Sequence, residues 1–267
     1  MTAPVLLPTR TVAKPWGCEA LPAPFPAPCG ERIGEIWFEP DGALSELLVK
    51  YLFTSENLSV QVHPDDEHAP AGTRGKEECW LVVAAQPGAC LAVGFREPLT
   101  PEAMRTAALD GSIERLLEWH PVQPGDFFYL PASTVHAVGP GLTLIEIQQN
   151  SDVTYRLYDY GRPRELHLDE AVSIAKGEPH PAALRRRLTD RESAVLVEGP
   201  HFRLERVCGV PDRGLAARFS GTALVVPVRG SLEAGGTRVV PGQCVQITDL
   251  GAVRFDPSGD ALIAAPL

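Results

Sequence analysis

Apolar residues along this chain recur in short runs that glycines and prolines interrupt, a pattern typical of β-strands and tight turns. The runs are rich in β-branched and aromatic side chains, and the 26 prolines and 24 glycines supply frequent turns. Long segments in which apolar residues recur with the periodicity of a helix are rare. The pattern predicts an all-β protein with a few short helices, built from small barrels.

Three short segments carry helix signals instead. Thr100 is a favourable cap, and the proline and glutamate that follow it favour a helix that runs to Leu109. A second helix is predicted from Ser112, and a third over residues 168–175, where two acidic residues suit the positive helix start. The first two form a short helical insert near residues 98–119.

A change in composition after residue 176 predicts two units. The stretch that ends at residue 190 is polar, basic and contains proline, so we interpret it as a linker between residues 1–176 and residues 177–267. Segment 121–130 resembles segment 237–246, since each is a Pro-Gly turn that leads into a strand. The second copy has no histidine after that strand. We therefore expect tandem barrels, of which the first binds a metal and the second is degenerate and metal-free.

Composition and charge narrow the classes of protein. With 267 residues and 44% apolar content the chain can bury a substantial core, while a net charge of −10 disfavours nucleic acid as a partner. Apolar runs fall far short of the roughly 20 residues of a membrane span, and no secretory signal is visible. The six cysteines form no C-x-x-C pair, which favours reduced thiols. We expect a cytoplasmic protein without nucleic-acid or membrane partners.

Polar side chains line one face of a predicted strand. Ser59, Gln61 and His63 alternate with two valines, so they point to the same side. An amide and an imidazole on the inner face of a barrel need partners, because burying them unpaired costs a few kcal/mol. A metal ion would satisfy both. Taken alone, however, this pattern is more typical of a solvent-facing stripe.

Two further segments favour a metal site. Glu78 lies on the next predicted strand, and His136 follows a glycine, a five-residue strand and a proline, a spacing that resembles the second metal motif of cupin barrels. Gln61, His63, Glu78 and His136 together suit one Zn²⁺ or another first-row divalent ion per chain, with positions left open for substrate. The remaining positive charge could stabilise a developing oxyanion, which indicates catalysis.

The same segments resemble a known family. Residues 59–66, 75–80, 131–137 and 146–161 are similar in order and spacing to type I mannose-6-phosphate isomerase (phosphomannose isomerase), especially its short bacterial form. The resemblance covers roughly residues 12–176, and the last 90 residues are only generically cupin-like. It implies tandem jelly-roll barrels and an intramolecular oxidoreductase that interconverts mannose 6-phosphate and fructose 6-phosphate through a cis-enediol.

The resemblance also implies roles beyond the metal ligands. Arg156 is the leading candidate to bind the sugar phosphate, since a guanidinium grips phosphate through two bonds. Ser59 and Lys76 are expected to hold substrate, although Lys76 could equally pair with Glu78. Glu146 alternates with two isoleucines, which predicts an inward carboxylate and makes it the candidate proton-transfer base. We thus expect Arg156, Glu146 and Lys76 to take part in catalysis.

Several alternatives stay open at this point. Glu146 could instead orient a metal-bound histidine, and metal-bound hydroxide, His136 or Lys76 could move the proton. A cupin oxygenase with Fe or Mn would share the metal layout, but it would not need Ser59, Lys76 and Arg156 around an anion. A non-catalytic sugar-binding protein could retain every residue. The native metal, the preferred sugar phosphate and the choice between monomer and homodimer are not determined.

Overall fold

The computed structural model describes residues 3–26, 30–40, 42–188 and 192–267. Cys29 and the predicted linker residues 189 and 190 lie outside these ranges. The predicted helices are present, together with one that the sequence did not indicate: α1 (Pro101–Asp110), α2 (Ile113–Leu116), α3 (Leu168–Ile174) and α4 (Arg213–Arg218). Short 3-10 turns occupy Gly42–Leu44, Ala182–Leu184 and Leu250–Ala252.

The predicted cap is confirmed at α1. Thr100 Oγ1 accepts the backbone N–H of Ala103 at 3.2 Å, and Gly111 ends the helix in the left-handed conformation that glycine adopts without strain. None of the helices in the described residues is long and apolar enough to cross a bilayer.

Two large sheets have the same order in a run of four strands. The first consists of β13 (Arg185–Arg187), β9 (Asp126–Leu130), β6 (Glu78–Ala85), β11 (Leu142–Gln149), β4 (Leu47–Phe53), β3 (Ile33–Phe38) and β2 (Thr9–Cys18). The second consists of β1 (Val5–Leu6), β19 (Val245–Ile247), β16 (Ala223–Arg229), β21 (Asp260–Pro266), β15 (Phe202–Cys208) and β14 (Ala194–Glu198). The run β9-β6-β11-β4 in the first sheet therefore corresponds to β19-β16-β21-β15 in the second.

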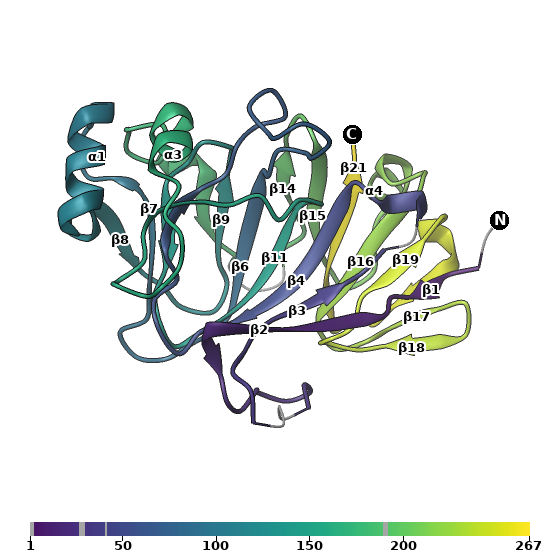
Figure 1. The fold of residues 1–267 in the computed structure, drawn as a ribbon. Helices are drawn as coiled ribbons and strands as arrows, with labels where there is room; N and C mark the ends of the chain where they lie inside the picture. The colour runs from purple at the N-terminus through teal and green to yellow at the C-terminus, as the bar shows by residue number, and fades with distance from the viewer. Residues whose placement is uncertain (1–2, 27–29, 41, 189–191) are drawn as a thin grey trace.

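Each large sheet has a smaller partner sheet. In the first half it consists of β12 (Tyr155–Tyr158), β5 (Val60–Val62), β10 (His136–Val138), β7 (Cys90–Phe95) and β8 (Leu117–Pro121). In the second half it consists of β18 (Thr237–Val239), β17 (Leu232–Ala234) and β20 (Val253–Phe255). The neighbours β8-β7-β10 repeat as β18-β17-β20. This repeated topology confirms the expected tandem barrels (Figure 1).

The seven-stranded sheet is the middle layer, and its two faces belong to different cores. On β6, Cys79 and Leu81 pack into a core shared with Phe202 of the second barrel. Trp80 and Val82 of the same strand point the other way, into the core of the first barrel. Alternate side chains of β6 therefore point into the interior of the first barrel and toward the second barrel.

The second barrel has apolar side chains where the first has Glu78 and His136. Ala223 begins β16 as Glu78 begins β6, and it pairs with the last residue of β19 just as Glu78 pairs with the last residue of β9. Val253 begins β20 where His136 begins β10. The residues between these strands form an apolar core. The interior of the second barrel is therefore filled by hydrocarbon side chains.

Two strands join the halves across the predicted division at residue 176. β1 pairs with β19 of the second barrel, and β13 pairs with β9 of the first. Part of the stretch interpreted as a linker is thus an edge strand, in which Arg187 forms an ion pair with Asp126 at 2.7 Å. The division into residues 1–176 and 177–267 remains a prediction.

Candidate metal centre and substrate cavity

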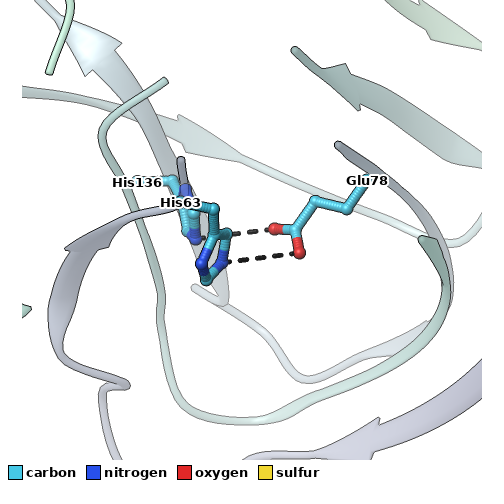
Figure 2. A group of neighbouring side chains, drawn as sticks. All are labelled: His63, Glu78 and His136. Carbon is cyan, nitrogen blue, oxygen red and sulfur yellow. Dashed lines mark ion pairs between the residues drawn. The ribbon is translucent and has the colours of Figure 1, made fainter. Parts of the chain in front are cut away.

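Two imidazoles and a carboxylate meet inside the first barrel. His63 follows β5, Glu78 begins β6 and His136 begins β10, and one nitrogen or oxygen atom of each lies within 4.8 Å of the others. Figure 2 shows both rings directed at the carboxylate. All three residues are buried. The three strands that the sequence singled out therefore bring their polar residues to one point.

Backbone carbonyls fix the orientation of both rings. Nδ1 of His63 lies 2.9 Å from the carbonyl oxygen of Val153, and Nδ1 of His136 lies 3.0 Å from that of Thr134. A carbonyl only accepts, so each Nδ1 carries the proton and each Nε2 keeps a lone pair. The Nε2 atoms lie 3.6 and 3.5 Å from the oxygens of Glu78. Metal-binding histidines typically donate their other ring N–H to a backbone carbonyl in this way.

The charges at this point also suit a cation. Burial lowers the pKa of His136 to about 4 and that of His63 well below its usual value, so both rings are neutral near pH 7. Burial raises the pKa of Glu78, against the opposing charge of Lys76. Oε1 of Glu78 is buried and accepts no hydrogen bond from the described residues. A carboxylate oxygen left unpaired in this way is costly, and a divalent ion would satisfy it.

Gln61 completes the predicted set, but its amide is turned so that the nitrogen faces His136. Nε2 of Gln61 lies 3.2 Å from Nε2 of His136, and Ser59 Oγ donates to Gln61 Oε1 at 3.0 Å. A metal-binding role requires the amide to rotate so that its oxygen faces the imidazole. Ser59 permits both orientations because a hydroxyl can donate or accept. Its described contact is with Gln61.

Buried lysines surround the two carboxylates. Lys76 Nζ lies 2.6 Å from Glu78 Oε2, 3.6 Å from Glu146 Oε1 and 3.0 Å from Nε2 of His63. Lys50 Nζ lies 3.1 Å from Glu146 Oε1. Burial by itself raises the pKa of Glu146, but the charges of Lys50 and Lys76 outweigh it and lower the pKa to about 2. Glu146 is therefore held as a carboxylate.

The structure adds residues that sequence reasoning missed. Lys50 is the clearest case: the ring of Trp37 lies 4.5 Å from its ammonium, and Trp37 in turn donates to Glu35 at 2.6 Å. The sequence does contain an indication of this buried lysine, since β4 is a run of apolar residues with a single charged residue in the middle. A buried lysine of this kind must have partners. The partner strands, however, could not be identified from the run itself.

A cavity opens beside this cluster. Its lining includes Gln61, Lys76, Glu146 and Arg156, and its complete lining is Lys14, Trp16, Glu35, Trp37, Lys50, Leu52, Leu58, Gln61, Lys76, Glu146, Asp152, Thr154, Arg156 and Arg164. Basic side chains outnumber acidic ones in this set, although the chain as a whole carries a charge of −10. Such a cavity favours an anionic ligand. Ser59 does not belong to the lining.

Arg156 is placed to meet such a ligand. It lies on β12 directly opposite Gln61 of β5, and its Nε is buried with no hydrogen-bond partner among the described residues. The neighbouring Arg164 is held differently, because two of its nitrogens each lie 2.6 Å from a carboxylate oxygen of Asp159. Arg156 therefore keeps donors for an anion that the cavity could receive.

Comparison with known proteins bears on this geometry. The chain is 39% identical over 180 residues to the mannose-6-phosphate isomerase of Streptococcus mutans, which covers 63% of this chain and 56% of that one. It is 39% identical over 192 residues to the mannose-6-phosphate isomerase ManA of Bacillus subtilis, covering 65% and 61%. This chain is related in sequence to mannose-6-phosphate isomerases. The resemblance recognised in its motifs is thereby confirmed, whereas no family model matches.

Solved mannose-6-phosphate isomerases share the whole fold. The crystal structure of the Bacillus subtilis enzyme superposes with a TM-score of 0.79 over 99% of this chain and 100% of that one, at 24% identity. A zinc-bound mannose 6-phosphate isomerase superposes with a TM-score of 0.72 over 99% and 100%, at 15% identity. The chain therefore has the cupin-like fold of mannose-6-phosphate isomerases. In sequence it spans about six-tenths of the length of the curated relatives named above.

Proposed function

We propose that this protein is a metal-dependent aldose-ketose isomerase that interconverts mannose 6-phosphate and fructose 6-phosphate through a cis-enediol. The observation that supports it best is the pair of imidazole Nε2 atoms directed at Glu78, beside a cavity lined by basic side chains. The named relatives carry the same activity in their names. Metal ligands and an anion-binding cavity are the two features that the reaction requires.

The metal set is His63, Glu78, His136 and, after rotation of its amide, Gln61. Two nitrogens, one carboxylate and one amide oxygen suit Zn²⁺, with one ion per chain, and one structural relative is described as zinc bound. A divalent cation at this point would stabilise negative charge on the adjacent oxygens of the sugar. Ser59 supports the set through its hydrogen bond to Gln61.

The phosphate is assigned to Arg156. Its unpaired Nε and its place on the cavity wall leave donors for the far end of the sugar phosphate. Lys76 lies at the other end, with its ammonium between Glu78 and Glu146. Lys76 forms the ion pair with Glu78 that the sequence analysis gave as an alternative role. It also lines the cavity. We assign it to a substrate oxygen near the reacting carbons.

Proton transfer between the two carbons is assigned to Glu146. It is a buried carboxylate on the cavity wall, and Lys50 and Trp80 fix its two oxygens at 3.1 and 3.2 Å. Its depressed pKa keeps it ionised, at some cost in base strength. In the described residues Glu146 is hydrogen-bonded to Lys50 and Trp80 and not to either imidazole, so the alternative in which it orients a histidine gains no support.

The test compares turnover before and after chelation. Purified protein is assayed with mannose 6-phosphate and, in reverse, with fructose 6-phosphate. It is then treated with a chelator and reconstituted with Zn²⁺. We expect interconversion that the chelator abolishes and zinc restores. Oxygen consumption with Fe or Mn would indicate an oxygenase, and full metal occupancy without turnover of any hexose phosphate would indicate a sugar-binding protein. The cytoplasmic location and the oligomeric state remain predictions from the sequence.

A further inference from the structure

Glu77 separates two residues of the site but faces away from it. Lys76 and Glu78 point into the first barrel, and Glu77 points across the sheet toward the second barrel, where it is 3% exposed. Its backbone is tied to β11, since its N–H donates to the Gln149 side chain at 2.9 Å and its carbonyl accepts from Gln149 N at 3.0 Å. A shift of the Glu77 carboxyl group would therefore move the backbone of the two neighbouring residues, Lys76 and Glu78.

The turn between β14 and β15 of the second barrel reaches this carboxyl group. Glu77 is hydrogen-bonded to the hydroxyl of Tyr129, and Gly199 packs against both. A methyl group on Gly199 would lie 2.7 Å from Tyr129 Oη and 2.8 Å from Glu77 Oε1. Gly199 is therefore required for space, since its backbone is not in the left-handed region. In Figure 1, β14 and β15 lie behind β6, as this contact demands.

The same turn also reaches the loop that precedes Glu77. His201 Nδ1 lies 3.5 Å from Oδ2 of Asp66, and Asp66 accepts the N–H of Gly75 at 2.7 Å and the amide of Gln149 at 3.2 Å. Asp66 thus closes the loop between the strand of His63 and the strand of Glu78. Gly199 and His201 therefore contact the end and the beginning of the segment that joins two metal-binding strands.

We propose that the turn Glu198–His201 of the second barrel is a positioning element for the first, with Gly199 holding Glu77 and thereby setting the places of Lys76 and Glu78. The second barrel then has a role in the site without contributing a residue to it. Geometry at such a site is demanding, because a displacement of about 1 Å can cost about a hundredfold in rate. The proposal depends on the proposed function only in that Lys76 is assigned there to substrate and Glu78 to the metal.

The test uses Gly199→Ala in the full chain, with Gly221→Ala as the matched control. Gly221 is an exposed glycine of the same barrel whose added methyl group would meet nothing within 4 Å. We expect Gly199→Ala to weaken Zn²⁺ binding about tenfold, as the loss of supporting contacts does at other metal sites. We also expect kcat to fall by a similar factor while KM changes less.

Hydrogen exchange gives a readout that needs neither zinc nor substrate. The amides of residues 76–78 should exchange faster in Gly199→Ala than in wild type or Gly221→Ala. If Gly199→Ala fails to fold, Glu77→Ala and Glu77→Gln replace it: only the glutamine keeps an acceptor for Tyr129, so it should retain the zinc affinity that alanine loses.

Unchanged exchange and zinc affinity in Gly199→Ala, with only a lower Tm, would overturn the proposal and reduce the contact to a stabilising one. Absence of isomerase turnover in the wild type would instead refute the proposed function. The exchange result would still decide whether the turn positions residues 76–78.

Discussion

Lys50 and Glu146 lie 96 positions apart in the chain and form a buried ion pair, with Nζ of one 3.1 Å from Oε1 of the other. They face each other directly across strands β4 and β11. Trp37, on the other side of β4, pairs with Lys50 and places its ring 4.5 Å from the ammonium. The pair therefore joins three neighbouring strands at the wall of the cavity.

Removing one partner of this pair should destabilise the fold. Lys50→Met keeps most of the side chain but leaves the Glu146 charge with less compensation in a buried place, so unfolding should require about 3–5 kcal/mol less free energy. Urea denaturation measures the change. Lys50→Met combined with Glu146→Gln should be less destabilised than Lys50→Met alone. Arg254→Met, in an exposed ion pair with Glu233, is the control and should cost under about 1 kcal/mol.

Glu146→Gln should lower kcat by about a hundredfold or more, because it removes the proposed base while preserving its shape. The pKa of Glu146 is depressed to about 2, so its charge is present at higher pH and lost only as the pH falls toward that value. Any acid limb of the pH profile of kcat/KM between pH 5 and 7 must then come from other groups. We expect that limb to keep its midpoint in the variant; its disappearance would show that Glu146 titrates there.

His136→Ala should abolish stoichiometric zinc binding. Loss of a direct ligand should exceed the roughly 10–100-fold effect of losing a supporting contact. Because a ligand of the folded state stabilises it, zinc at one hundred times its dissociation constant should add about 2.7 kcal/mol to the unfolding free energy of the wild type. The variant should show no such gain by calorimetry. His68→Ala changes an exposed histidine and should behave as wild type.

Arg156→Ala should raise KM for the sugar phosphate about tenfold or more, since a charge-assisted hydrogen bond contributes roughly 1.5–3 kcal/mol. The residual turnover of unphosphorylated mannose, if measurable, should change little. Arg156→Lys should recover only part of the loss because an ammonium cannot form two parallel bonds. Arg186→Ala, an exposed arginine on β13, provides the control. Equal losses for both sugars would contradict the assignment of Arg156 to phosphate.

Local patterns indicated which side chains come together at the candidate metal centre. The alternation of a strand places Gln61 and His63 on one face, and the cap at Thr100 starts its helix where the sequence indicates. Glu78 was identified from its place on the next predicted strand, and His136 from a spacing that resembles a cupin metal motif. Such features depend on neighbouring residues, whose relative directions are fixed by the geometry of one strand or one helical turn.

The sequence by itself therefore determined the class of fold, three of the helices in the described residues and the strand faces on which the candidate metal ligands lie. Only the tertiary structure placed Lys50 against Glu146, gave His63 and His136 their carbonyl partners, and brought Gly199 against Glu77. The physical reason is that periodicity reports the direction of a side chain within its own strand. Which strand becomes its neighbour is decided by long-range pairing and by the burial of two sheet faces against each other.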